Sequence, residues 1–163
     1  HCNKKKSGHD TYAEPIADPT KDDPRSLFYI ENYRYRSYDP SLHSRARLTY
    51  SVLGLNDTDE KVMPRFIIGN RLTQELEKIY EDAMELGNDI NSNARKRNRI
   101  LNGCTELLRM CTRSSRFGAT MATVLHESDD YNNLKDFLFQ YGLWNKEMEN
   151  LHQESLSISL SKK

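Results

Sequence analysis

"NRLTQELEKIYEDAMELGNDINSNARKRNRILNGCTELLRMCTR", residues 70–113, is the stretch that decides the fold class. Apolar residues recur in it at steps of three, four or seven, which keeps them on one face of a helix. The spacing predicts one long amphipathic helix over residues 70–113, or two helices broken near residues 91–93. The residues of this apolar stripe are Leu72, Leu76, Ile79, Ala83, Leu86, Ile90, Ala94, Leu101, Cys104, Leu108 and Cys111.

Two further helices are expected after this stretch. Residues 114–127 have the pattern of a short helix, and residues 128–156 that of a C-terminal helix with Ser128 as its N-cap. The remaining residues form a Ser-rich tail ending in Lys162 and Lys163, which we expect to be frayed.

The first 69 residues are less regular. Residues 1–25 are polar and contain three prolines, which predicts a disordered arm. In residues 26–69 the alternation in "SLFYIENYRYRSYD" suits an exposed strand, whereas other short apolar runs there fit a strand or a helix. The predicted fold is therefore mainly α: an elongated bundle of three to four helices, one of them long, in a single domain over residues 26–163. A disordered N-terminal arm precedes it, and two short strands fit within residues 26–68.

Composition limits the function classes. The 163 residues suit one domain, and 24 basic residues balance 24 acidic ones, so a globally basic nucleic-acid binder is not expected. The seven glycines are scattered and the five histidines lack metal-ligand spacing, which predicts no catalytic residue, cofactor or metal site. Cys104 and Cys111 are interpreted as buried thiols. An enzyme with an unrecognised site remains an alternative.

The N-terminal segment "HCNKKKSGHDTYAEP" has features of a tether. Cys2 is a lipidation candidate beside Lys4, Lys5 and Lys6, which suit an anionic lipid surface. Tyr12 is a phosphorylation candidate because its surroundings are polar. No run reaches the roughly 18 apolar residues of a spanning helix, so we expect any membrane segment or leader outside these residues.

Three further sites have ordinary structural alternatives. The basic cluster Arg95, Lys96, Arg97 and Arg99 suits an acidic partner or anionic lipid, and equally the solvated half of a long helix. Tyr50 in "LTYSVL" resembles the immunoreceptor tyrosine-based inhibitory pattern, but such apolar runs are commonly buried. Asn56 in "NDT" matches a glycosylation acceptor, which matters only in a secreted protein.

These observations predict a non-enzymatic protein–protein interaction module tethered near a membrane, with the cytoplasmic face favoured. It would bind a partner, or itself, through the apolar helix stripe, without a cofactor or nucleic acid. A secreted helical ligand or effector and a bacterial lipoprotein domain are the alternatives.

Overall fold

A computed structural model describes residues 8–18, 20–41 and 44–162. The chain folds as two compact units. Unit 1 is His1–Ile67 with Leu160–Lys163, and unit 2 is Ile68–Ser159. Both units contain buried apolar side chains of their own.

Unit 1 is built around a β-hairpin. The short helix α2 (Pro24–Leu27) leads into β1 (Phe28–Glu31), which pairs antiparallel with β2 (Arg34–Ser37). Ile30 lies opposite Tyr35 in the hairpin register. The connecting residues Asn32 and Tyr33 have φ angles of 50° and 61°, the left-handed conformation that a two-residue hairpin turn requires.

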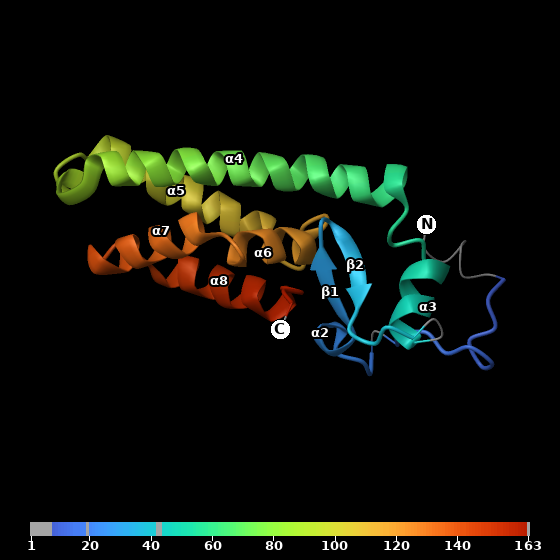
Figure 1. Cartoon of the computed structure of the whole chain (residues 1–163). Helices are drawn as coiled ribbons and strands as arrows, with labels where there is room; N and C mark the ends of the chain where they lie inside the picture. The colour runs from blue at the N-terminus through green and yellow to red at the C-terminus, as the bar shows by residue number, and fades with distance from the viewer. Residues whose placement is uncertain (1–7, 19, 42–43, 163) are drawn as a thin grey trace. The chain divides into compact units, whose positions relative to one another are not determined.

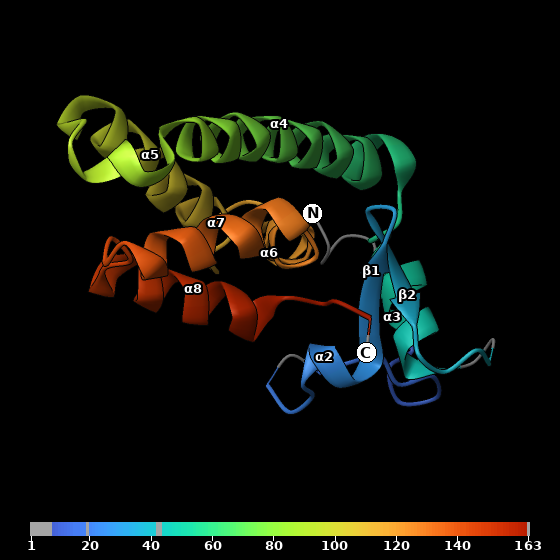
Figure 2. The same cartoon turned by 60° about the vertical axis from the view of Figure 1, so that its left-hand side comes forward.

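Two helical segments complete unit 1 (Figure 2). Helix α3 (Arg45–Val52) begins at Ser44, whose hydroxyl accepts a hydrogen bond from the Arg47 N–H. The π-helical turn Thr58–Val62 then continues into α4 (Met63–Leu86). The buried apolar side chains of unit 1 are few: Phe28, Ile30, Ala46, Val62 and Leu160.

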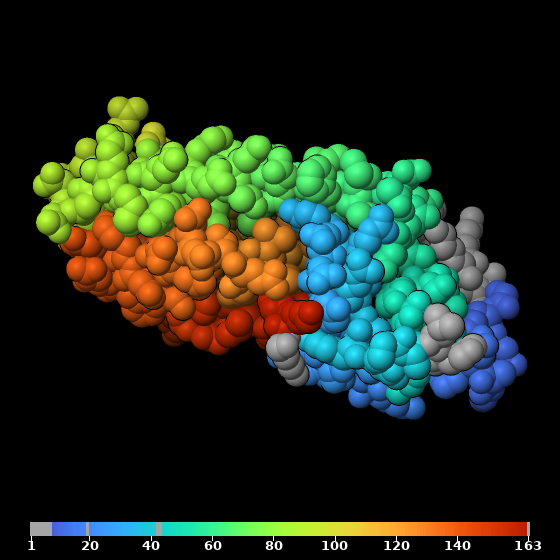
Figure 3. Space-filling model, viewed as in Figure 1, coloured from blue at the N-terminus to red at the C-terminus, as the bar shows by residue number. Residues whose placement is uncertain are grey.

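Unit 2 is a helical bundle (Figure 1). It contains most of α4, the 3-10 turn Gly87–Asn91, α5 (Ala94–Met110), α6 (Gly118–His126), α7 (Asp129–Gln140) and α8 (Lys146–Ile158). The core is apolar, and the space-filling view shows side chains closing the space between α4 and α7 on the face drawn (Figure 3). Its fully buried residues include Leu72, Leu76, Leu108, Met121, Leu125, Leu134, Leu138 and Met148.

Close helix approach in unit 2 depends on Gly118, the first residue of α6. A Cβ atom there would lie 2.0 Å from the Thr112 carbonyl oxygen, which is too close for any other residue. The segment joining α5 to α6 can therefore turn tightly over the start of α6.

The helix breaks are set by local signals. Over residues 70–113 the structure has two helices, because the 3-10 turn follows α4 and Asn93 caps α5 by accepting a hydrogen bond from the Lys96 N–H. The single helix expected over residues 128–156 is wrong. That region forms α7 and α8, separated by Gly142 at φ 67° and restarted by the Asn145 cap.

The predicted fold class is confirmed. The chain is mainly helical, at 64% helix, with a two-stranded antiparallel sheet in residues 28–37. Its longest helical stretch, from the π-turn through α4 to the 3-10 turn, has 34 residues. The described residues contain seven α-helices, more than the expected three to four, because short helices form in residues 24–52 and the C-terminal one is divided.

A membrane-crossing helix would need a long apolar run. Among the described residues, no helix combines the required length with the required hydropathy.

Candidate protein-interaction surface

The apolar stripe predicted to hold a bundle or a dimer lies largely inside unit 2. Most of its members, from Leu72 to Cys111, are buried in the core cluster. Ala94 is exposed, and Ile79 and Leu101 are only partly buried. Ile100 and Leu107, which the pattern did not include, are buried instead. The buried members of the stripe already pack within unit 2. Association with a partner or a second copy through this stripe stays a prediction.

A different helix face is exposed and apolar. Met63, Phe66 and Ile67 share one face at the start of α4 and leave 45%, 46% and 62% of their surface in solvent. The Tyr33 ring packs edge-on against Phe66, with 5.5 Å between ring centroids. We call these four residues the Phe66 patch; all of them belong to unit 1.

A buried arginine, Arg65, contacts the Tyr33 backbone of the Phe66 patch. Arg65 is 3% exposed, donates to the carbonyl oxygens of Leu55 (2.7 Å) and Tyr33 (3.4 Å), and lies 4.9 Å from the centre of the Tyr35 ring. Burial lowers the pKa of Arg65 and raises that of Tyr35. Arg65 thus fixes the turn that carries Tyr33, so the patch presents a preformed surface.

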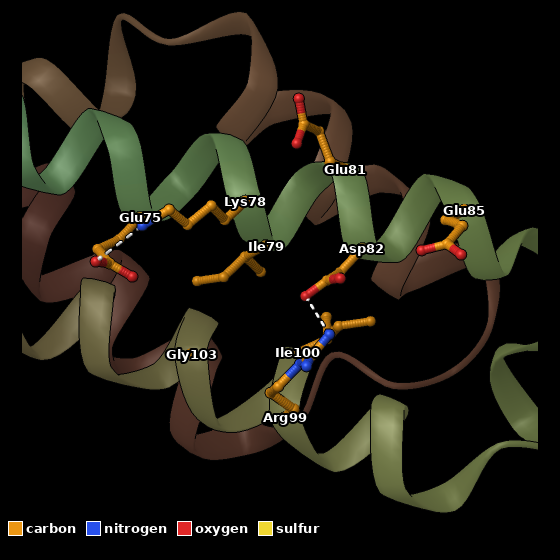
Figure 4. A pocket seen from close by; sticks show the side chains of 9 residues that line it. All are labelled: Glu75, Lys78, Ile79, Glu81, Asp82, Glu85, Arg99, Ile100 and Gly103. Atoms are coloured by element: carbon orange, nitrogen blue, oxygen red, sulfur yellow. Dashed lines mark hydrogen bonds and ion pairs between the residues drawn. The ribbon is translucent and has the colours of Figure 1, made fainter.

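A second surface feature is the groove between α4 and α5 in unit 2 (Figure 4). It encloses about 650 Å³ and has charged walls, with Arg99 donating to Asp82 at 2.7 Å and Lys78 lying 3.6 Å from Glu75. At its floor Ile79 packs against Gly103. Most charges at its walls are paired with one another or with Lys96, so we do not assign it a ligand.

The predicted basic cluster is partly used within unit 2. Besides the Arg99–Asp82 pair, Lys96 lies 3.5 Å from Glu85, and Arg97 donates to the Asn91 carbonyl at 3.2 Å. Arg95 is exposed. These contacts favour the structural interpretation of the cluster, although its contact with a partner or membrane stays a prediction.

Several of the remaining predicted site residues lie in the N-terminal segment. Cys2, Lys4, Lys5 and Lys6 lie outside the described residues, so lipidation and membrane contact stay predictions. Tyr12 is 99% exposed, as a kinase substrate must be.

Tyr50 and Asn56 lie in the folded part of unit 1. Tyr50 is partly buried on α3. The Asn56 amide donates to the Tyr35 carbonyl at 2.9 Å and accepts from the Tyr35 N–H at 2.8 Å. The nitrogen that would carry a sugar is therefore engaged in a structural pair.

Sequence reasoning missed a polar cluster inside unit 2. Tyr131 and His152 Nδ1 are 2.6 Å apart, and His126 Nε2 lies 2.9 Å from the Ser155 hydroxyl, which donates to the His152 carbonyl at 2.8 Å. Burial lowers the pKa of His126 to about 4, lowers that of His152 and raises that of Tyr131. Ser155 is fully buried, so the cluster is structural and does not offer a reachable nucleophile. Its members come from separate helices, α6, α7 and α8, and have no common spacing in the sequence.

The two thiols in the described part of the chain are poorly reactive. Cys104 and Cys111 are buried, and burial raises the pKa of each thiol to about 12, which suppresses the thiolate. Within the described ranges, no three His, Cys, Asp or Glu residues are grouped so as to hold a metal ion.

The Phe66 patch was also missed, although a signal was present. The spacing of Met63, Phe66 and Ile67 is i, i+3, i+4, which indicates one helix face. Pro64 and the short run "FIIG" left that segment undecided between strand and helix. Pro64 is the second residue of α4, which directly follows the π-helical turn Thr58–Val62.

Comparison with known proteins identifies a bacterial relative. The chain is 36% identical over 156 residues to the Septu protein PtuB of Bacillus thuringiensis. The alignment covers 96% of this chain and 58% of that protein, so the chain spans less than two thirds of its relative's length. No family model matches the chain, and no solved structure matches it. The chain is therefore similar to PtuB over nearly its whole length.

Proposed function

We propose that this chain is a protein-interaction module that binds a different protein through the Phe66 patch, and that its role in the assembly is binding rather than catalysis. We propose that the partner is another protein of a Septu system, because the relative is named Septu protein PtuB. Since the chain spans 58% of that relative, the proposal concerns only the part that the chain represents.

The observation that carries the proposal is the exposed aromatic and aliphatic face at the start of α4. Its three exposed helix residues present on the order of 300 Å², about the size of the largest apolar patch on a typical monomer, and such patches are often functional. Aromatic residues in preformed surroundings are the usual anchors of protein interfaces. Phe66, supported by Tyr33 and Arg65, fits that description.

The patch area favours a different protein over a second copy. Obligate homodimer interfaces bury roughly 2,000–5,000 Å² in total, which is further above what this patch exposes than the roughly 1,600 Å² of a standard complex between different proteins. Asp59 and Glu60 are exposed one turn before Met63, which gives the patch an acidic rim. The partner we propose therefore presents an apolar socket bordered by basic residues.

The test begins with site-specific photo-crosslinking in the native cells. A benzophenone amino acid replaces Phe66 in one variant and Phe139 in the other. Phe139 is a matched control because it is a phenylalanine that is 54% exposed but lies on α7 of unit 2. We expect one protein crosslinked from position 66 and not from position 139.

The partner is then purified and its affinity measured by titration calorimetry. Phe66→Asp should weaken binding by at least about 30-fold, the effect of losing a 2 kcal/mol anchor, whereas Phe139→Asp should change it less than about threefold. Thermal melting of both variants checks that folding is intact. Equal crosslinking from both positions, crosslinks to a second copy alone, or an unchanged affinity of Phe66→Asp would overturn the proposal.

A further inference from the structure

The Phe66 patch contains a side chain that peroxides can oxidise. Met63 is the first residue of α4 and leaves 45% of its surface in solvent. Phe66 and Ile67 follow it at i+3 and i+4, so the three side chains are neighbours on one helix face. A thioether is apolar and adaptable, which suits a binding surface, and oxidation converts it into a polar sulfoxide.

Most other methionines of the chain are shielded from solvent. Met121 and Met148 are fully buried, and Met110 is partly buried against the core of unit 2. Met84, on the unit 2 part of α4, is 40% exposed and so resembles Met63 in access to solvent. Because oxidation follows exposure, Met63 and Met84 should react first.

The two described cysteines do not compete with these methionines for peroxide. Cys104 and Cys111 are buried in unit 2. Burial also raises the pKa of each thiol to about 12, so the reactive thiolate is scarce at neutral pH. Within the described ranges, oxidation at sulfur is thus directed to the exposed thioethers.

Oxidation of Met63 would alter the surface of unit 1 and leave its backbone contacts in place. The Met63 N–H donates to the Thr58 carbonyl, and this bond does not involve the side chain. The Tyr33–Phe66 ring contact and the Arg65 bond to Tyr33 lie on other residues. A sulfoxide oxygen is a strong acceptor to which an apolar socket offers no donor, so its burial costs free energy.

We propose that Met63 is a redox-sensitive site, and that its oxidation by hydrogen peroxide weakens binding at the Phe66 patch. The Met63 sulfur gives an electron pair to one peroxide oxygen, the O–O bond breaks, and the second oxygen leaves as water after taking the proton of the first. Sulfur is oxidised and peroxide is reduced. Methionine sulfoxide reductases reverse the change. The effect on binding rests on the proposed function, because it concerns the same patch.

The first experiment locates the oxidation and needs no partner. The full chain is treated with hydrogen peroxide for increasing times, the reaction is stopped with catalase, and the methionine peptides are analysed by mass spectrometry. Met63 and Met84 should be oxidised at least about tenfold faster than Met121 and Met148. Oxidation of Met63 no faster than that of the two buried residues would overturn the proposal.

The second experiment measures affinity by titration calorimetry for the protein crosslinked from position 66. Only the chain is treated with peroxide, and catalase is added before mixing. Wild-type chain should lose at least about tenfold in affinity, whereas Met63→Leu, which keeps an apolar side chain of similar volume, should change less than about threefold. Met84→Leu is the matched control and should lose as much as wild type. Circular dichroism checks that folding is intact.

The results separate this inference from the proposed function. Equal losses in wild type and Met63→Leu would assign the sensitivity to another residue, and full affinity of a chain oxidised at Met63 would show that the patch tolerates a sulfoxide; either result overturns the redox site alone, provided that Phe66→Asp binds weakly in the same series. If Phe66→Asp binds as tightly as wild type, the proposed function fails, and the effect of Met63 on binding fails with it.

Discussion

Unit 1 and unit 2 are each stabilised internally by a different kind of contact. Unit 2 buries a continuous cluster of apolar side chains that recur at helical spacing. Unit 1 buries only five apolar side chains among its described residues and joins its segments through polar groups, above all Arg65 and Asn56. The apolar stripe of a helix can be recognised from the spacing of a few consecutive residues. The hydrogen bonds of Arg65 and Asn56 join residues that have no common spacing in the sequence.

Substitution of a core residue should have the largest effect, in unit 2. Leu108 is fully buried, so Leu108→Asp places a carboxylate without a partner in an apolar core and should cost more than about 4 kcal/mol. Thermal or urea unfolding followed by circular dichroism measures the loss. Ile67→Asp, at a position 62% exposed, is the control and should change stability by less than about 0.5 kcal/mol. Equal stability of the two variants would contradict the assignment of the core.

Substitution of Arg65 should have the next largest effect on stability, and this effect should be confined to unit 1. Arg65→Ala leaves the carbonyl of Leu55 without its 2.7 Å donor and removes the cation beneath Tyr35, which we expect to cost about 3 kcal/mol. Amide exchange should rise around Tyr35 and stay unchanged in α7 and α8. Arg71→Ala, an exposed arginine on the same helix, is the matched control. If Arg65→Ala melts both units together, the expectation that its effect is confined to unit 1 is wrong.

The smallest effect should come from pH, in the polar cluster of unit 2. Because burial lowers the pKa of His126 to about 4, the unfolded chain binds a proton below about pH 6.5 that the folded chain does not. Stability is therefore full above pH 6.5 and falls as the pH drops toward 4. We expect a loss of about 2 kcal/mol from His126, after allowing for solvent screening of a partly exposed ring.

Urea unfolding at pH 7, 5.5 and 4.5 measures this loss. His126→Gln should flatten the profile, because it removes the proton that only the unfolded chain binds in this range. Lys135 and Glu149 also act on the cluster, with Lys135 lowering the pKa of His126 and Glu149 raising that of His152. A profile that His126→Gln leaves as steep as before would assign the acid sensitivity to other groups.

The parts of the structure that followed from the sequence are those with local causes. The apolar period of residues 70–113 predicted helices, and the break near residues 91–93 coincides with the Asn93 cap. The alternation around Tyr33 and Tyr35 suggested an exposed strand, and residues 34–37 form β2 of the two-stranded sheet. The break at Gly142 was missed because Leu138, Tyr141 and Met148 continue the helical spacing across it.

The contacts of the site residues were harder to predict because they join residues that are far apart in the sequence. Arg65 contacts Tyr33 and Leu55, and His126 meets a residue 29 positions away. The tail was expected to be frayed because its composition is polar, yet its one buried leucine and a backbone carbonyl fix it to β1. Phe66 was within reach of periodicity alone, but a proline two residues earlier hid the helix start.

Asn56 gives unit 1 a sensitivity to chemical ageing. Asparagine side chains hydrolyse slowly to aspartate, and in Asn56 this change replaces the amide nitrogen that donates to the Tyr35 carbonyl with an oxygen. Two acceptors would then face each other at the Tyr35 carbonyl, whereas the Tyr35 N–H would keep its acceptor on residue 56. A single spontaneous reaction, with a mass change of about one dalton, would thus weaken the cover of the β2 edge.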